Sequence, residues 1–253
     1  MKAGDQMMLD AMLKALKLPT VRRIYGEAAR QAESEGVAYE DYLLELVSRE
    51  QEQRQANLIK RRLRDAGFPQ MKTLADTDLS KWPGFEARKV KQLADGAYLA
   101  KKENIVLIGK HGTGKTHAAL ALGIEACQQG YRVKFTTAAA LVNQLVETRE
   151  QRNLKSLMRK LRGVNLLILD ELGYIPFSTE GAQLLFQVLS ERNEQASTLI
   201  TTNLNFSEWT AVFGEENLTA ALLDRVTHRC HIQQFDWDSV RYAESLRMRE
   251  GDG

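Results

Sequence analysis

Residues 109–116 read Gly-Lys-His-Gly-Thr-Gly-Lys-Thr, and this glycine-rich segment constrains the fold more strongly than any other part of the chain. An apolar run of strand length, 105–108, precedes it, and an alanine- and leucine-rich run, 118–122, follows it as the body of a helix. In such a strand–turn–helix unit, the backbone amides of the turn and of the helix start point towards one anion. The segment therefore predicts a phosphate-binding loop, and a glycine turn without a ligand is the simpler alternative.

The polar residues of the predicted loop have expected tasks. Lys115 is placed to reach the β- and γ-phosphates of ATP, and the Thr116 hydroxyl is placed to bind Mg²⁺. The two histidines that flank these residues need no catalytic role. The residues that we expect to contact the nucleotide are Gly109, Lys110, His111, Gly112, Thr113, Gly114, Lys115, Thr116 and His117.

Two further apolar runs, 166–169 and 199–200, lead into polar side chains. The first is followed by Asp170 and Glu171, and the second by two threonines and Asn203. Open α/β sheets bind ligands at the carboxyl ends of their strands. We expect Asp170 to hold Mg²⁺ through water, Glu171 to polarise the attacking water, and Asn203 to bind the γ-phosphate or that water. Without the loop, the acidic pair would indicate solvated surface and Asn203 an ordinary turn residue.

Strands and helices are expected to alternate after residue 103. Strands are predicted at 104–108, 132–136, 165–170 and 197–202, with helices at 113–129, 138–162 and 179–195. This alternation implies right-handed crossovers and a mostly parallel sheet, so the expected fold class is α/β.

The first 66 residues are expected to form a small all-α domain. One helix precedes residue 17, a second spans 20–35 with Thr20 as its N-cap and Gly36 as its stop, and a third spans 39–66. The helical stripe of the first helix predicts that Met7, Met8 and Met12 are core residues. A connector at 67–84 and a helix at 86–101 follow, and residues 85–253 form the domain with the phosphate loop.

Composition excludes several classes of protein. The chain has 253 residues and only two cysteines, Cys127 and Cys230, so no disulfide framework is expected and a cytoplasmic location fits. No secretory signal is seen, and no apolar run approaches the ~18 residues of a membrane span. His228, Cys230 and His231 lie close together, but without a second ligand pair they do not predict a zinc site.

The three motifs, together with Leu222–His231 (LLDRVTHRCH), resemble the AAA+ ATPases. Within them the chain looks like the initiator and helicase-loader branch, which includes DnaC-type loaders, and is most similar to the IstB-type helper ATPases of bacterial insertion sequences. The resemblance covers about residues 68–245. It implies a AAA+ P-loop core flanked by helices, DNA as a partner without strong sequence preference, homo-oligomers with ATP sites between subunits, and a cognate transposase as partner.

The resemblance also implies an arginine that one subunit supplies to the site of the next, where it neutralises charge on the transferred phosphoryl group. Arg225 is the matching residue, and Arg229 is the reserve. The alternative is a surface arginine paired with Asp224 or Asp236. Few residues follow His231, so little or no helical lid is expected, and Arg241 is at most a weak candidate for a lid arginine.

Two basic clusters are candidates for DNA contact. The resemblance implies an extra DNA-contacting helix within 138–162, where Lys155, Arg159 and Arg162 share one helical face. Phosphate binding needs such cations, whereas a solvated helix face is the alternative. The second cluster consists of Lys60, Arg61 and Arg64, and it is equally suited to contact with the transposase.

Several functions remain open from sequence alone. The leading hypothesis is a DNA-stimulated ATPase that helps transposition, and a replicative helicase loader would share the same core. A small-molecule kinase needs an acceptor pocket and often a lid, for which there is no sequence sign. A DNA-binding scaffold that binds ATP without hydrolysing it is the remaining alternative. Partner choice is expected to reside in residues 1–66.

Overall fold

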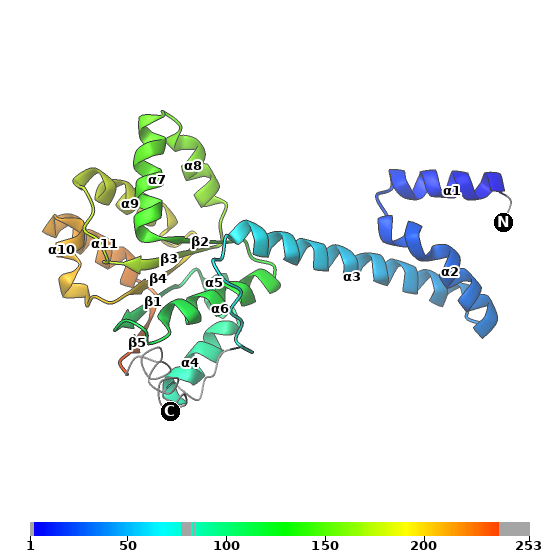
Figure 1. The fold of residues 1–253 in the computed structure, drawn as a ribbon, viewed down its shortest axis with the longest axis horizontal. Coiled ribbons are helices and arrows are strands. Elements are labelled where there is room, and N and C mark those ends of the chain that lie inside the picture. The colour runs from blue at the N-terminus through cyan, green and yellow to red at the C-terminus, as the bar shows by residue number, and fades with distance from the viewer. Residues whose placement is uncertain (1–2, 77–81, 83, 238–253) are drawn as a thin grey trace, which may run out of the picture. The chain divides into compact units, whose positions relative to one another are not determined.

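The computed structural model describes residues 3–76, 82 and 84–237 (Figure 1). The chain divides into two compact units, Met1–Arg61 and Arg62–Gly253. The division falls inside one long helix, so the last residues of that helix belong with the second unit. No helix within the described ranges is long and apolar enough to cross a membrane.

The first unit contains the three helices that the sequence predicts. They are α1 (Ala3–Ala15), α2 (Pro19–Glu35) and α3 (Tyr39–Ala66), the last of which continues into the second unit. Leu13, Val21 and Leu46 form their small shared core. The predicted core role of the three methionines is wrong, because Met7, Met8 and Met12 are exposed, Met7 by 79%.

The start of α2 differs from the expectation. Leu18 rather than Thr20 is the N-cap, and Pro19 occupies the first turn. The backbone N–H groups of Thr20 and Val21 donate to the Glu50 carboxylate of α3, at 2.8 and 3.1 Å. A carboxylate from the neighbouring helix therefore satisfies the amides that a side-chain cap would otherwise bind. Gly36 ends α2 in the left-handed conformation, as predicted.

The second unit is a five-stranded parallel sheet with helices on both faces (Figure 1). The strand order is β2-β3-β4-β1-β5. The strands are β1 (Asn104–Gly109), β2 (Val133–Thr137), β3 (Leu166–Leu172), β4 (Ser197–Thr202) and β5 (Cys230–Phe235). The helices are α4 (Gly84–Ala94), α5 (Ala97–Lys101), α6 (Lys115–Gln128), α7 (Ala138–Glu150), α8 (Leu154–Arg162), α9 (Thr179–Arg192), α10 (Thr210–Phe213) and α11 (Glu216–Thr227), with a 3₁₀ turn, η2, at Phe206–Glu208.

The central strands are buried on both faces, which explains their unbroken apolar runs. Alternate residues of one strand face different cores: Val106 packs with α7, α8, α9 and α11, whereas Ile105 packs with α4, α5 and α6. This arrangement confirms the α/β fold class and the helical flanks.

Three details of the second unit differ from the predicted elements. The helix expected at 86–101 is two helices, because Gly96 takes a φ of 76° and a Cβ there would lie 2.0 Å from Gln129 Oε1. The basic segment 138–162 is split into α7 and α8, as its length allowed. Strand β5 was not predicted, since Gln233 and Gln234 interrupt its apolar pattern.

Candidate functional site

The sheet order brings the three sequence motifs to one edge. Strand β4 lies between β3 and β1, and Thr202 at its end pairs with Ile108 of β1 and Leu172 of β3. The glycine loop after β1, the acidic pair on β3 and Asn203 after β4 therefore follow three adjacent parallel strands. This is the carboxyl edge at which open α/β sheets bind ligands.

The glycines of the loop are required by its geometry. Gly114 has a φ of 100°, and a Cβ there would lie 3.1 Å from the Trp82 indole nitrogen. A Cβ on Gly109 would lie 2.2 Å from the Phe235 carbonyl oxygen. Helix α6 then begins at Lys115, so its first amides face the turn.

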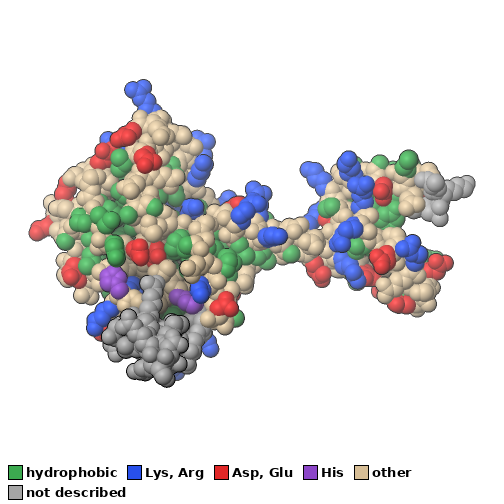
Figure 2. All heavy atoms as spheres, viewed as in Figure 1, with side chains coloured by type: hydrophobic (Ala, Val, Ile, Leu, Met, Phe, Trp, Pro, Cys, Tyr) green, Lys and Arg blue, Asp and Glu red, His purple; other side chains and the backbone are tan. Residues whose placement is uncertain are grey.

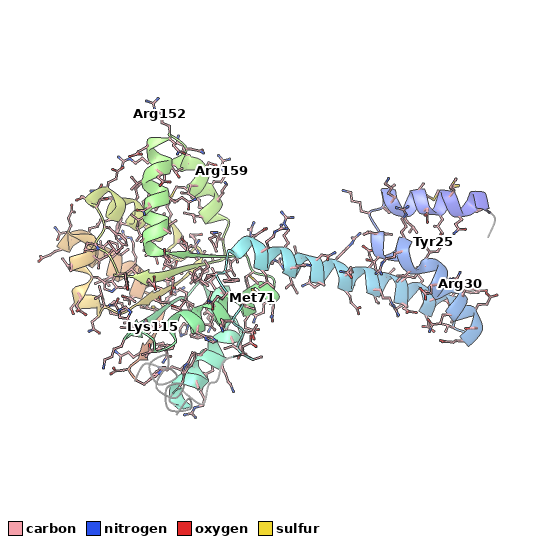
Figure 3. The ribbon with its side chains drawn as sticks, viewed as in Figure 1. Tyr25, Arg30, Met71, Lys115, Arg152 and Arg159 are labelled. Atoms are coloured by element: carbon pink, nitrogen blue, oxygen red, sulfur yellow. The ribbon has the colours of Figure 1, made fainter. Side chains whose placement is uncertain are left out.

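Lys115 lies inside this loop at the start of α6 (Figure 3). Its ammonium donates to the carbonyl oxygens of Gly109 and Lys110, both at 2.6 Å, and its side chain is largely buried. Thr113 also donates to the Lys110 carbonyl, at 2.9 Å. The loop is thus folded around a cation placed where phosphate oxygens are expected to bind.

The acidic strand is joined directly to the loop. The Thr116 hydroxyl lies 3.0 and 3.1 Å from the two carboxylate oxygens of Asp170. Asp170 is buried, with 4% of its surface exposed. Thr201 on β4 donates to the same carboxylate at 2.5 Å. A hydroxyl and a carboxylate fit Mg²⁺, which binds through one or two carboxylates together with substrate phosphates and water. Among the described residues, no group of three or more His, Cys, Asp or Glu side chains could hold a metal ion.

Glu171 has an unusual backbone. Its φ is 57°, it is exposed while its neighbours Asp170 and Leu172 are buried, and its N–H donates to Thr201 Oγ1 at 2.9 Å. Sequence reasoning missed Thr201, because the only available signal was its place in the Thr-Thr-Asn triplet. Asn203 is half-buried in the bend after β4, between the other two motifs.

The two histidines of the loop lie in different surroundings. The exposed His111 ring packs edge-on against Tyr174, with 5.7 Å between the ring centroids. His117 is half-buried, and its pKa lies below the ordinary value because burial, followed by the charge of Lys72, disfavours the imidazolium against the opposing effect of Asp76.

Arg225 on α11 does not form the ion pair considered as its alternative role. Its Nη1 donates to the Ala221 carbonyl at 2.8 Å, and its guanidinium lies 5.0 Å from the centre of the Phe186 ring. Neither Ala221 nor Phe186 belongs to the phosphate-binding loop, so these contacts do not connect Arg225 to the nucleotide site of its own subunit. Arg229 is exposed after α11, and Arg241 lies outside the described residues.

The basic residues proposed for DNA are exposed on α8. Lys155, Arg159 and Arg162 are exposed on α8. Leu157 and Leu161 of the same helix are buried. In Figure 3 Arg159 projects from α8 and Arg152 from the tip of the α7–α8 pair. In Figure 2 Lys and Arg side chains lie at that tip and on the α8 side, and Asp and Glu side chains lie just below the tip.

Not all of these cations are equally available. Arg162 donates to Glu191 of α9 at 2.8 Å. In the second cluster, Lys60 and Arg61 of the first unit and Arg64 of the second unit are exposed, and Arg64 pairs with Asp65 at 3.3 Å.

The two histidines near β5 each lie beside a carboxylate. His228 pairs with Glu194 at 3.3 Å, and His231 pairs with Glu103 at 2.7 Å. Burial raises the pKa of the Cys230 thiol to about 12.

Comparison with solved structures supports the fold. The chain is similar to the crystal structure of DnaI, with a TM-score of 0.56 and 18% identity over 69% of this chain and 93% of that chain. It is also similar to AMPPCP-bound DnaA from Aquifex aeolicus, with a TM-score of 0.57 and 18% identity over 74% of this chain and 56% of that chain. At such identities the likeness shows the fold alone.

Comparison of sequences shows the family. The chain is 33% identical over 239 residues to a protein of Pseudomonas aeruginosa described as an ATP-binding protein of insertion sequence IS21, which covers 94% of this chain and 90% of that protein. It is 33% identical over 235 residues to the corresponding protein of insertion sequence IS5376 from Geobacillus stearothermophilus, over 93% of this chain and 94% of that protein. The family model for the IstB-like ATP binding protein matches residues 11–248. The chain therefore belongs to the family of IstB-like ATP binding proteins.

Proposed function

We propose that this chain is an Mg²⁺-dependent ATPase that oligomerises on DNA and recruits or stimulates a partner transposase. The observation that carries the ATPase part is the contact of Thr116 with Asp170, at 3.0 and 3.1 Å. It joins the phosphate-binding loop to the carboxylate strand in the arrangement that a nucleotide with its metal requires.

The residues at the carboxyl edge of the sheet have separate roles in the proposed hydrolysis. The loop amides and Lys115 bind the phosphates. Thr116 and Asp170 would hold Mg²⁺, which would supply positive charge at the phosphate oxygens. Glu171 accepts a proton from the attacking water as the new oxygen–phosphorus bond forms. The bond from the γ-phosphorus to the bridging oxygen breaks, and ADP leaves with that electron pair. Asn203 orients the water or the γ-phosphate.

Part of each ATP site is proposed to lie on a neighbouring subunit. Arg225 is half-buried, bonded to its own helix and stacked on a ring, so it needs no carboxylate partner to stay in place. Such an arginine is suited to stabilise the charge of the transferred phosphoryl group across a subunit boundary. Residues 85–253 form the ATPase domain in this scheme, with residues 67–84 as the connector.

DNA is proposed to bind the α7–α8 pair. The exposed cations of α8 suit phosphate contacts, which need charge but no base-reading side chains. Lys60 and Arg61 of the first unit and Arg64 of the second unit are further candidates for contact with DNA or with the transposase. The helical region 1–66 is proposed to select the partner.

The transposase is favoured as partner because the relatives are described as proteins of insertion sequences. A helicase loader is the alternative, since the DnaC helicase loader has a similar fold. Capture of the full chain tests this, with immobilised transposase from the same insertion sequence and immobilised replicative helicase from the same host, each with ATP and DNA. Retention on the transposase alone is expected, and retention on the helicase alone would replace the proposal with the loader function.

A further inference from the structure

Thr201 occupies the point where β4 meets the acidic pair of β3. Leu169 pairs with Ile200 and Leu172 pairs with Thr202, so two residues of β3, Asp170 and Glu171, lie opposite Thr201 alone. Two residues facing one define a β-bulge, a feature that re-aims side chains beside active sites. We infer that Thr201 is a positioning residue, which holds this bulge and thereby sets the direction of both carboxylates for ATP hydrolysis.

The hydroxyl of Thr201 bonds both residues of the bulge. It donates to Asp170 Oδ1 at 2.5 Å and accepts from the Glu171 N–H at 2.9 Å. A hydroxyl has one proton, so an oxygen that gives it to Asp170 faces Glu171 with a lone pair. The hydroxyl can therefore donate to the Asp170 carboxylate and accept from the Glu171 amide at the same time. Valine has the same shape as threonine but can form neither hydrogen bond.

The Glu171 backbone needs such support. A non-glycine residue at a φ of 57° is held in a sparsely populated conformation, which persists only where its surroundings fix it. The bond from its N–H to Thr201 is a contact that fixes it, and the Thr201 residue is itself 1% exposed. Without this acceptor, the bulge is expected to relax and Glu171 to leave the direction required of a base.

Thr116 and Thr201 therefore have different tasks at Asp170. Thr116 comes from the loop and is the hydroxyl assigned to Mg²⁺, whereas Thr201 comes from the sheet and bonds the bulge itself. Loss of Thr201 should consequently affect the rate of turnover more than the binding of ATP. This inference rests on the proposed ATP hydrolysis.

The test compares Thr201→Val, Thr201→Ser and a matched control, Thr198→Val, in the full chain. Thr198 lies on the same strand, is similarly buried and accepts a hydrogen bond from Arg192 at 3.2 Å, away from the acidic pair. Thr201→Val should lower kcat by about 10- to 100-fold, as expected for a lost hydrogen bond to a charged group, with ATP affinity changed less than about threefold. Thr201→Ser should restore most of kcat, and Thr198→Val should keep it. If Thr201→Val does not fold, Thr201→Ala is measured in its place.

Hydrogen exchange at the Glu171 amide gives a second readout that does not depend on turnover. The amide should be protected in the wild type and in Thr198→Val, and should exchange faster in Thr201→Val. Unchanged kcat in Thr201→Val while Glu171→Gln loses activity would overturn the inference and leave ATP hydrolysis standing. Unchanged protection of the amide would also overturn it, whereas a wild type without turnover but with this exchange pattern would contradict only the proposed hydrolysis.

Discussion

The Thr116 hydroxyl on the phosphate-binding loop lies 3.0 and 3.1 Å from the two carboxylate oxygens of Asp170 on the acidic strand. The two residues are far apart in sequence and meet because β4 holds β1 and β3 on either side. The phosphate-binding loop and the strand proposed to bind Mg²⁺ thus share one edge of the sheet, and this pair joins them.

Replacement of Lys115 tests the nucleotide site itself. Lys115→Ala removes the ammonium that lies 2.6 Å from two loop carbonyl oxygens and should abolish measurable ATP binding, while the fold is retained. Titration with a fluorescent ATP analogue measures the affinity. Lys101→Ala, which removes an exposed ammonium from α5, is the control and should bind normally. Normal ATP affinity in Lys115→Ala would contradict the assignment of this loop as the nucleotide site.

Replacement of Arg225 tests whether the site is shared between subunits. Arg225→Ala should keep ATP binding but lower turnover about 100-fold or more, because a charge-stabilising group is lost. The fold should persist, since the substitution removes one hydrogen bond to a backbone carbonyl and the stacking on the Phe186 ring. An equimolar mixture of Arg225→Ala and Glu171→Gln should regain part of the activity, because some sites then combine an intact glutamate with an intact arginine. A mixture with no activity would assign Arg225 to its own subunit or to the fold.

Glu191 is expected to restrain DNA binding. It holds Arg162 at 2.8 Å, and the hydrogen bond from Arg162 keeps the pKa of Glu191 below its ordinary value. Glu191→Gln should raise affinity for duplex DNA several-fold, and the salt dependence should steepen by about 0.9 if Arg162 gains one phosphate contact. Glu194→Gln removes an equal charge just beyond the end of α9 and is the control. An equal gain in both variants would indicate a general charge effect instead.

Glu50 makes the start of α2 sensitive to acid. Burial alone would raise its pKa, but hydrogen bonds from Val21, Arg54 and Thr20 outweigh burial and lower it. The stabilisation is therefore complete above the pKa of the unfolded chain, about 4.3, and is lost as pH falls through the lower pKa of the folded chain. Glu50→Gln should cost about 1–2 kcal/mol at pH 7, and this difference from the wild type should shrink as that lower pKa is crossed.

Hydrogen exchange at the Thr20 and Val21 amides of the full chain measures this local stability. Glu52→Gln removes an exposed carboxylate from the same helix and should leave the exchange unchanged. A difference between Glu50→Gln and the wild type that is constant with pH would contradict the role of the ionised Glu50.

Features encoded by local sequence could be predicted. The glycines around Lys115 and the apolar run before Asp170 locate the loop, two strands and the fold class, because each pattern has its own physical cause. The Gly36 stop of α2 is of the same kind.

Features that depend on distant neighbours could not be predicted. At the break near Gly96, Gln129 donates to the Ala94 carbonyl at the end of α4, and β5 is an edge strand whose glutamines hide its pattern. Thr201 is assigned only by a bulge in the neighbouring strand. The exposure of Met7, Met8 and Met12 likewise reflects how little of α1 its neighbours cover.

The most direct test of the central claim is ATP turnover by the full chain with Mg²⁺, with and without duplex DNA, in the wild type and in Glu171→Gln. The account predicts that the wild type releases phosphate to water, that DNA raises the rate, and that Glu171→Gln binds ATP with normal affinity but shows no turnover. Equal turnover in both proteins, or transfer of phosphate to a small-molecule acceptor without response to DNA, would contradict it.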